Sequence, residues 1–215
     1  MKGTSSPGID GLTVNHLRTF WDNLSHITRD ALNCSFGGEL TTSLRKAVIK
    51  LLRKGTKDPT LTGNYRPISL LSIFYKLASY AITQHIKTSV NSIIGRQPKA
   101  YNKSNNIGSV LLNLINLIKH VTEKEKNAII LLIDFKKAFE RIDHTFMHNA
   151  MALLGFGPDI ITWIKLFFHK RDAQILMGGH MSDKISLNQG VPLGDVISLY
   201  IFILMVDILL LKIKN

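Results

Sequence analysis

The stretch NAIILLIDFKKAFERID, residues 127–143, joins a purely apolar run to a charged segment with helical spacing. Residues 128–133 are all apolar and rich in isoleucine and leucine, which predicts a strand buried on both faces, although periodicity alone leaves a buried helix open. The run stops at Asp134. An ionised carboxylate at the tip of a buried strand is costly unless a basic side chain or a metal ion meets it. Asp134 is therefore either a functional acid or a simple helix cap.

The segment after Asp134 predicts a short helix that turns over the tip of the strand. Its apolar residues recur at helical spacing, and charged residues fill the positions between them. The apolar positions are Phe135, Ala138, Phe139 and Ile142.

Length and composition indicate a globular chain of one large or two small domains. It has 215 residues, of which 45% are hydrophobic and 20% charged. The single cysteine, Cys34, excludes an internal disulfide, suits a reducing compartment and is expected in the core. The N-terminal residues 1–11 lack the apolar core of a signal peptide, so we expect an intracellular protein of the nucleus or the cytoplasm.

The positive charge is concentrated in one part of the chain. The net charge is +12, and residues 41–103 hold twelve Lys and Arg against one acid, Asp58, which gives that segment +11. A segment of one sign predicts a polyanionic partner, either nucleic acid or an acidic membrane. Nucleic acid is favoured because the charges are dispersed through apparently folded sequence and not gathered in a juxtamembrane cluster.

Apolar periodicity and turn residues predict the remaining elements. Thr13 or Asn15 is expected near the start of the first helix, and Pro158 at the first position of a later one. Pro67 holds Arg66 in an extended conformation. The last helix contains Asp207 and is shorter than the roughly 20 apolar residues of a membrane span, so we expect it in the core. The predicted helices cover residues 12–32, 73–94, 107–121, 146–154, 158–168 and 196–211, and the predicted strands cover residues 47–52, 173–177 and 184–187.

Several blocks of the sequence resemble reverse transcriptases of non-LTR (LINE-type) retrotransposons. In chain order they are SPGIDG (6–11), NYRPISLL (64–71), QPKAYNKSNNIG (97–108), LIDFKKAFERID (132–143) and QGVPLGDVIS (189–198). Each is weak alone, but together, in this order, they are a strong match from about Ser6 to Leu211.

The resemblance implies an α+β chain with a right-hand polymerase fold. Residues 1–125 would form the fingers and residues 126–215 part of the palm, without the rest of the palm and the thumb. It further implies an RNA template, a DNA primer, dNTP substrates and Mg²⁺, and no membrane. In the family fold, the strand ending at Asp134 pairs with strands that would lie beyond Asn215.

The same resemblance assigns the catalytic and metal-binding residues. Asp134 matches the first catalytic aspartate, and its carboxylate and the backbone carbonyl of Phe135 would bind Mg²⁺. Hard carboxylate oxygens on a rigid strand are what two-metal nucleotidyl transfer requires. Phe139 matches the aromatic residue that lies beneath the incoming sugar and excludes a 2′-hydroxyl, with ordinary core packing as its alternative.

The nucleotide-binding residues follow from the other blocks. Arg66 matches an arginine that contacts the triphosphate, and Lys54 a basic residue of the same fingers hairpin. Gly190 and Gly194 match glycines where the backbone passes close to template and nucleotide. His144 and His148 have the i, i+4 spacing of a zinc pair, but they lack an intervening glutamate and a third ligand, so a solvated helix face is expected.

Four departures from the family bear on activity. Glu140 replaces the usual Asp, Leu193 the usual Gln beside the nucleotide, and Leu199 the usual Pro. The sequence ends at Asn215 before any Tyr/Phe-X-Asp-Asp motif, which carries further metal ligands. We therefore expect this chain, as it stands, not to polymerise DNA. The alternatives are a non-catalytic RNA-binding remnant and a fragment of a gene model without a stable folded product.

Overall fold

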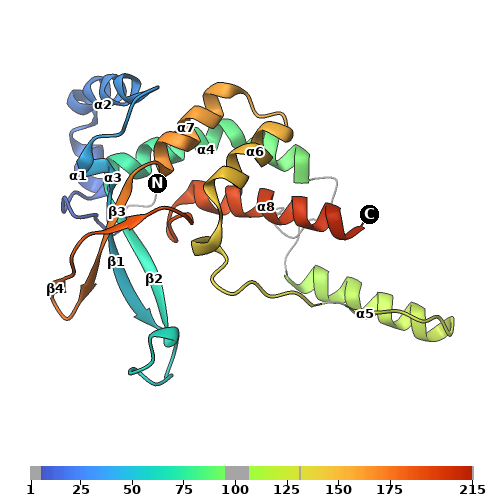
Figure 1. The fold of residues 1–215 in the computed structure, drawn as a ribbon. Helices are drawn as coiled ribbons and strands as arrows, with labels where there is room; N and C mark the ends of the chain where they lie inside the picture. The colour runs from blue at the N-terminus through green and yellow to red at the C-terminus, as the bar shows by residue number, and fades with distance from the viewer. Residues whose placement is uncertain (1–5, 95–106, 131, 215) are drawn as a thin grey trace.

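The computed structural model describes residues 6–94, 107–130 and 132–214, which form a small sheet and a layer of helices (Figure 1). The helices are α1 (Val14–Thr19), α2 (Trp21–Ser35), α3 (Thr42–Arg45), η1 (Thr62–Asn64), α4 (Ile73–Ile94), α5 (Ile107–Glu123), η2 (Phe139–Arg141), α6 (His144–Leu153), α7 (Pro158–Phe168) and α8 (Val196–Lys214). The strands are β1 (Lys46–Arg53), β2 (Tyr65–Leu71), β3 (Arg171–Met177), β4 (His180–Met181) and β5 (Ile185–Leu187).

The sheet is built around β1, which pairs with a different strand on each side. β2 lies antiparallel to β1, with Ile49 opposite Ser69, and β3 lies parallel to it, with Ile49 opposite Ile175. β3 pairs in turn with β4 and β5, both antiparallel, so the strands predicted over residues 173–177 and 184–187 lie side by side. The sheet therefore joins strands from both sides of residue 125.

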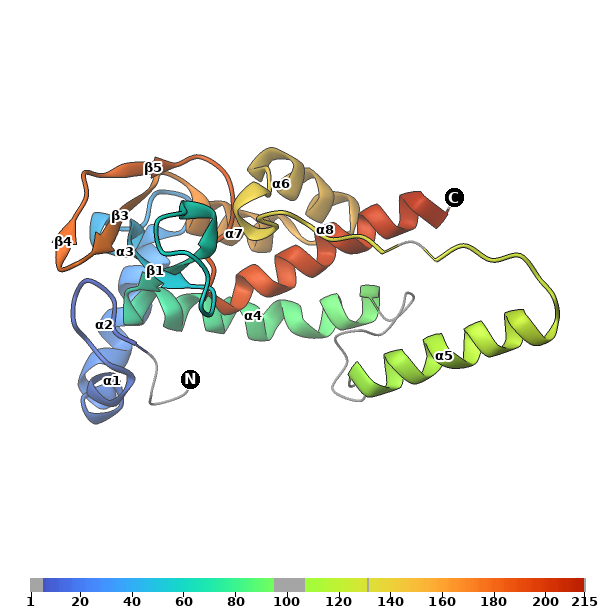
Figure 2. The same cartoon turned by 90° about the horizontal axis from the view of Figure 1, so that it is seen from below.

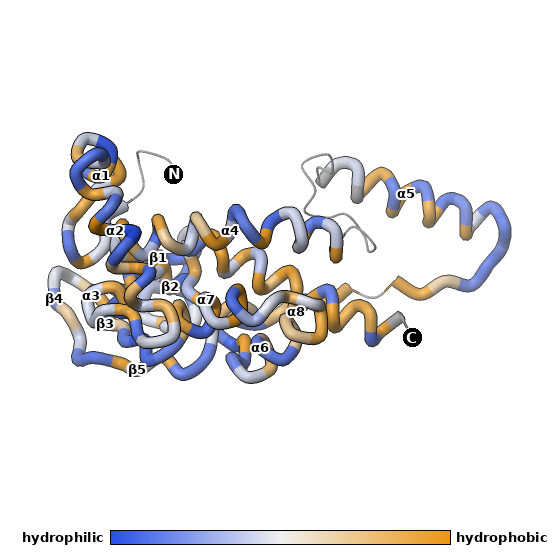
Figure 3. Tube along the Cα trace, turned by 90° about the horizontal axis from the view of Figure 1, so that it is seen from above, coloured by the Kyte–Doolittle hydropathy of each residue, from blue (hydrophilic) through white to orange (hydrophobic). Residues whose placement is uncertain are grey.

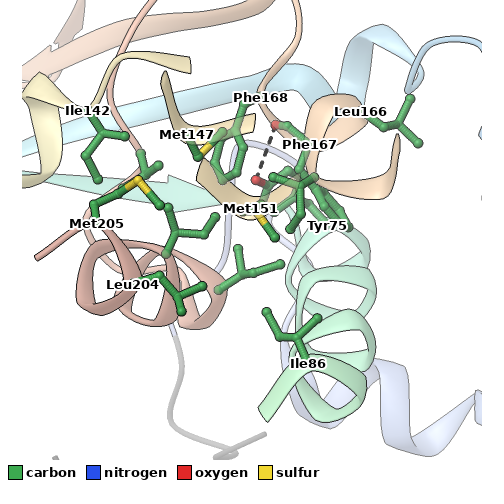
Figure 4. Packing of buried hydrophobic residues seen from close by; sticks show 14 of the residues in the cluster. Tyr75, Ile86, Ile142, Met147, Met151, Leu166, Phe167, Phe168, Leu204 and Met205 are labelled. Carbon is green, nitrogen blue, oxygen red and sulfur yellow. Dashed lines mark hydrogen bonds between the residues drawn. The ribbon is translucent and has the colours of Figure 1, made fainter. Parts of the chain in front are cut away.

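The core lies between the sheet and helices α4, α6, α7 and α8 (Figure 4). Tyr75 of α4 and Phe167 of α7 are fully buried, with ring centroids 5.2 Å apart in an edge-to-face arrangement. The Tyr75 hydroxyl donates to the Phe167 carbonyl at 3.5 Å. Met147 of α6 and Leu204 of α8 complete the contact between the helices. Each such side chain contributes about 1.5–3 kcal/mol through removal of its apolar surface from water.

The helix ends follow from local sequence. The Thr13 side chain accepts a hydrogen bond from the His16 amide at 3.2 Å and caps α1, as predicted. The helix predicted over residues 12–32 is divided at Phe20 into α1 and α2. Pro158 occupies the start of α7, as predicted. Cys34, expected in the core, is instead exposed on α2.

The prediction of a buried strand over residues 128–133 is wrong for the part of this run that the structure describes. Ile129 is 97% exposed and Leu132 86% exposed, and neither belongs to a strand. Both sides of β1 are already paired, and the outer edge of β2 is occupied by the Leu193 carbonyl, which accepts from the Ser69 amide at 3.0 Å. The described residues 128–130 and 132–133 form neither a helix nor a strand and lie in the segment that connects α5 to η2 (Figure 2). The short helix predicted after Asp134 is also wrong, because a turn and then η2 occupy that segment.

Helix α5 has the predicted apolar face, but it lies apart from the sheet and the core helices in both views (Figures 1 and 2). Its large apolar side chains Leu111, Leu112, Ile115, Leu117 and Ile118 are 45–61% exposed. The spacing therefore predicted the helix correctly without indicating what would cover it.

Helix α8 is mostly apolar, and its charged residues are Asp207, Lys212 and Lys214 (Figure 3). Its N-terminal half is buried through Ile197, Ile201 and Leu204, whereas residues 209–211 and Ile213 are exposed. The prediction of a core helix thus holds for the first half and is wrong for the second. Among the described residues, α8 alone is long and apolar enough to cross a membrane by length and composition, and 28% of its Val196–Ile213 window is buried.

Candidate nucleotide and nucleic-acid site

The β1–β2 hairpin carries Lys54 and Arg66, the two cations predicted to bind the nucleotide. Lys54 is bound to the far side of the hairpin, since its amide donates to the Asn64 carbonyl at 2.8 Å and its Nζ to the Gly63 carbonyl at 2.9 Å. Arg66 lies opposite Leu52 and has an exposed side chain. Because side chains alternate along a strand, Arg66 shares its face of the hairpin with Lys50. The hairpin therefore presents an exposed guanidinium and holds its lysine against the turn.

The loop before α8 is fixed to the segment that contains η2. The Gly190 amide donates to the Ile142 carbonyl at 2.8 Å, and the Val191 amide to the Phe139 carbonyl at 2.8 Å. Gly190 has a φ of +80°, and a Cβ built on it would lie 2.7 Å from the Glu140 carbonyl oxygen. Glycine is thus required here by packing against protein backbone, a reason that the sequence alone did not provide.

The other end of the same loop contacts the hairpin. Leu193 accepts from the Ser69 amide, and a Cβ on Gly194, whose φ is +115°, would lie 3.3 Å from the Ser69 carbonyl oxygen. The loop thereby spans from the Phe139 backbone to the edge of β2. The structure brings Gly190 and Gly194 together with Phe139 and the hairpin strand that carries Arg66.

Three aromatic rings form a cluster between the segment that contains η2 and helix α8. Phe139 stacks on Phe202 of α8 with ring centroids 4.9 Å apart and planes at 28°. Phe135 meets the same Phe202 edge to face at 6.1 Å. Phe139 is half-buried and packs against the core cluster.

Asp134 lies in the extended segment just before this cluster, and its side chain is exposed. Its carboxylate and the neighbouring Phe135 carbonyl are hard oxygen donors of the kind Mg²⁺ binds. Within the described ranges, no group of three or more His, Cys, Asp or Glu side chains gathers to hold a metal ion. The donor chemistry fits the metal, but this part of the chain supplies only a fraction of the six ligands that Mg²⁺ takes.

A buried polar cluster beneath the loop was not predicted from the sequence. Asp195 is 7% exposed, and its Oδ1 accepts a short hydrogen bond from the Ser79 hydroxyl of α4. Arg171, 3% exposed, donates from Nη1 to the Tyr75 hydroxyl at 3.3 Å and places its guanidinium 4.9 Å from the Tyr75 ring centre. Burial raises the pKa of Asp195, and the Ser79 hydrogen bond and the Arg171 charge oppose this shift. The sequence offered no signal for this burial, because Arg171 lies within the charged run Lys170-Arg171-Asp172.

The two histidines of α6 have protein partners or apolar surroundings. His144 Nε2 lies 2.8 Å from the Gly190 carbonyl oxygen and so links α6 to the loop. Burial, with the nearby charges of Lys165 and His144, lowers the pKa of His148 to about 4. The prediction that His144 lies on a solvated helix face is therefore wrong, because its ring supports the loop before α8.

Comparison of the sequence with known proteins identifies its family. The family model described as reverse transcriptase (RNA-dependent DNA polymerase) matches residues 52–215. That range includes the hairpin strand β2, Asp134, the aromatic cluster and the loop with Gly190 and Gly194.

Individual relatives cover most of the chain at low identity. A transposon TX1 uncharacterized 149 kDa protein of Xenopus laevis is 28% identical over 209 residues, 96% of this chain and 16% of that protein. An RNA-directed DNA polymerase from the mobile element jockey of Drosophila melanogaster is 25% identical over 74% of the chain and 18% of its own length. A Pol polyprotein from the type-1 retrotransposable element R2 of Popillia japonica is 25% identical over 98% of the chain and 29% of its own length. The chain thus spans less than a third of these relatives.

Proposed function

The chain belongs to the reverse transcriptase (RNA-dependent DNA polymerase) family, and from this premise we propose that it is the nucleotide- and template-binding part of an RNA-directed DNA polymerase of a non-LTR retrotransposon. Divalent metal chemistry is general in this family, and we infer Mg²⁺ as the ion. The observation that carries the proposal is the joining of the basic hairpin to the loop with Gly190 and Gly194, inside the range matched by the family.

In the proposal, residues 1–125 form the fingers and residues 126–215 the front of the palm. β1 of the first part and β3 of the second pair in one sheet, so the two parts would share a continuous sheet. RNA template and DNA primer would run along the basic segment of residues 41–103, which carries a net charge of +11.

The residues then take the following roles. Arg66 supplies a forked, permanently charged donor for the triphosphate, and Lys54 adds a point charge at the hairpin turn. Asp134 and the Phe135 carbonyl provide oxygen ligands for Mg²⁺, which when bound neutralises charge on the reacting phosphate. Phe139 lies beneath the sugar of the incoming nucleotide. Gly190 and Gly194 let the loop backbone pass close to the template and the nucleotide.

We further propose that this 215-residue chain does not polymerise DNA alone. Two-metal phosphoryl transfer requires several carboxylates around both ions, and Asp134 is the one carboxylate that the family pattern assigns within these residues.

Primer extension and nucleotide binding test the proposal together. Purified chain with primer–template, dNTPs and Mg²⁺ should give no extension above background, and extension that Asp134→Ala abolishes would contradict it. Arg66→Ala should weaken binding of a dNTP, whereas Arg29→Ala, which removes an exposed arginine of α2, should leave binding unchanged. Equal binding by both variants would contradict the role of Arg66.

A second candidate function is RNA binding without catalysis. The one-signed charge of residues 41–103 favours it, because contacts to phosphates need no intact metal site. This candidate predicts RNA affinity that is unchanged by Asp134→Ala and by removal of Mg²⁺, and a loss of affinity in either case would exclude it.

A further inference from the structure

A cavity of about 490 Å³ lies between helices α2 and α4, with one residue of α7 at its edge. Among the described residues that line it, none belongs to the β1–β2 hairpin or to the loop before α8. Its volume falls within the roughly 300–1,000 Å³ of sites that bind drug-sized molecules. The cavity is therefore separate from the candidate nucleotide and nucleic-acid site and large enough for a small molecule.

The cavity forms because α4 presents small side chains to α2. Ala78 and Ala81 of α4 line it, where larger apolar side chains would fill the space between the two helices. On the α2 side, Trp21, Thr28 and Leu32 recur at helical spacing, so they lie on one face and form the opposite wall. Both walls therefore belong to regular helices, which hold the shape of the space.

Both tryptophans of the chain line this cavity. Trp21 begins α2, and Trp163 lies in the middle of α7. The ring of Phe36 packs against that of Trp163, with centroids 5.2 Å apart, and so helps to fix its position. Aromatic side chains pair with other flat rings in offset or edge-to-face arrangements. The apolar part of a ligand is therefore expected to be a flat ring system.

The charge at the cavity is positive. Arg29 of α2 lines it, and no Asp or Glu is among the described residues that do so. The Nε of Arg29 donates to the Asp30 carboxylate at 3.1 Å, but the two side chains are 68% and 62% exposed, so this surface pair contributes little. The pair occupies Nε and leaves the Nη groups to bind a ligand carboxylate. The cavity thus combines an apolar interior with a permanently charged donor at its mouth.

We propose that this cavity binds a small amphiphilic anion, a flat aromatic body the size of naphthalene that carries one carboxylate. The rings occupy the space between Trp21 and the two alanines of α4, and the carboxylate meets Arg29. A macromolecular partner is disfavoured, because a stable interface buries at least about 1,000 Å² of surface and this site is a cavity bounded by helices. Binding here is independent of the proposed function, since the hairpin takes no part in it.

Quenching of tryptophan fluorescence measures binding in this cavity directly. The probe is 6-bromo-2-naphthoate, whose bromine quenches an indole on contact, and the neutral 6-bromo-2-naphthamide is the matched control for charge. The exposed apolar surfaces of α5 and of residues 128–133 carry no tryptophan, so binding there leaves the signal unchanged. The naphthoate should quench saturably and bind about fivefold more tightly than the amide.

Two variants locate the probe, with the melting temperature of each checked. Ala81→Leu adds three carbons at an exposed position of the α4 wall and should weaken binding of the naphthoate by about tenfold or more. Ala152→Leu makes the same change at an exposed position of α6 outside the cavity and should bind as the wild type does. Arg29→Gln should weaken binding of the naphthoate by about fivefold and leave that of the amide unchanged.

Each comparison can overturn the proposal. An absence of saturable quenching in the wild type, or wild-type affinity in a folded Ala81→Leu variant, would exclude the cavity as the site. Equal affinity of the wild type for naphthoate and amide, or an equal effect of Arg29→Gln on both, would exclude an anionic ligand. If Ala81→Leu does not fold, Arg29→Gln with the two probes decides, because it changes an exposed side chain. None of these results bears on nucleotide binding, which Arg66→Ala tests separately.

Discussion

Replacement of Gly190 by alanine should destabilise the folded chain in the absence of any nucleic acid. The new Cβ would lie 2.7 Å from the Glu140 carbonyl oxygen and 2.8 Å from the Glu140 Cα, both of which are backbone atoms that cannot rotate away. Alanine at the Gly190 φ of +80° is strained as well. Relief of the contact would separate the loop from the segment that contains η2 and break the hydrogen bonds from Gly190 and Val191.

The magnitude follows from these separate contributions. The left-handed backbone costs about 1–2 kcal/mol for a residue with a side chain. Each of the two backbone hydrogen bonds is worth about 1 kcal/mol net. Together they predict a loss of roughly 3–4 kcal/mol, a large part of the 5–15 kcal/mol by which a domain is stable.

Other glycines of the chain separate the two causes. Gly155 has a φ of +84° and open space around its Cβ position, so Gly155→Ala isolates the backbone strain at about 1–2 kcal/mol. Gly8 has no such φ, but its Cβ would lie 2.6 Å from the Leu71 backbone, so Gly8→Ala isolates the steric contact. Gly157 has neither feature and serves as the control.

Urea denaturation followed by circular dichroism measures the free energy of unfolding of each variant. The expected order of destabilisation places Gly190→Ala above Gly155→Ala and Gly8→Ala, with Gly157→Ala close to the wild type. A Gly190→Ala variant as stable as Gly157→Ala would refute the packing argument. The need for glycine would then have to come from template or nucleotide alone.

Three further predictions concern charge and local stability. Burial raises the pKa of Asp195 above 3.8, so the folded state binds the carboxyl proton more tightly than the unfolded state does. The free energy of unfolding should therefore fall as pH rises above 3.8, and Asp195→Asn should remove this loss in urea titrations at several pH values. Equal pH profiles for the variant and the wild type would contradict this assignment. The pKa of His148 is lowered to about 4, so its effect on stability has the opposite direction. As pH drops from 6.5 to 4, the free energy of unfolding should fall by on the order of 1–2 kcal/mol, after allowance for screening by solvent. His148→Gln should abolish this fall. A variant with the same acid-side loss would exclude His148. In hydrogen exchange on a monodisperse sample, amides of residues 128–130 and 132–133 should exchange far faster than those of α4, and equal protection would show that the exposed run is paired in solution.

Local signals predicted much of the fold. The helix over residues 73–94 has the same bounds in the structure, since its apolar residues recur at helical spacing. The extended conformation of Arg66 followed from Pro67, and the start of α7 from Pro158. Each of these features depends on residues close together in the sequence.

Features that depend on distant residues were not predicted. The parallel pairing of β1 with β3 joins residues more than a hundred positions apart, and no local pattern encodes it. The apolar run of residues 128–133 has the composition of a buried strand, but composition does not show whether a strand edge is free to pair with it. The contact between Asp195 and Ser79 likewise became visible only when α4 and the loop were placed together.

The same limit applies to the site. Sequence motifs selected Arg66, Gly190 and Gly194 as one group, and the structure places the loop with both glycines against β2. The support that His144 gives to the Gly190 carbonyl was missed, because histidine on a helix face carries no signal for a partner 46 positions away. Asp134 was selected on its position after the apolar run and stays exposed in the described structure.

The salt dependence of RNA binding tests the central claim most directly. The variant reverses three exposed charges of the hairpin, as Lys50→Glu, Arg53→Glu and Lys57→Glu, and a matched control reverses Lys119, Lys124 and Lys212 for the same change in net charge. Each phosphate contact on single-stranded RNA contributes about 0.7 to the slope of log affinity against log salt, so the hairpin variant should lose roughly two from the slope and the control almost nothing. An unchanged slope in the hairpin variant, or an equal loss in the control, would contradict the claim that this hairpin is the nucleic-acid surface of the chain.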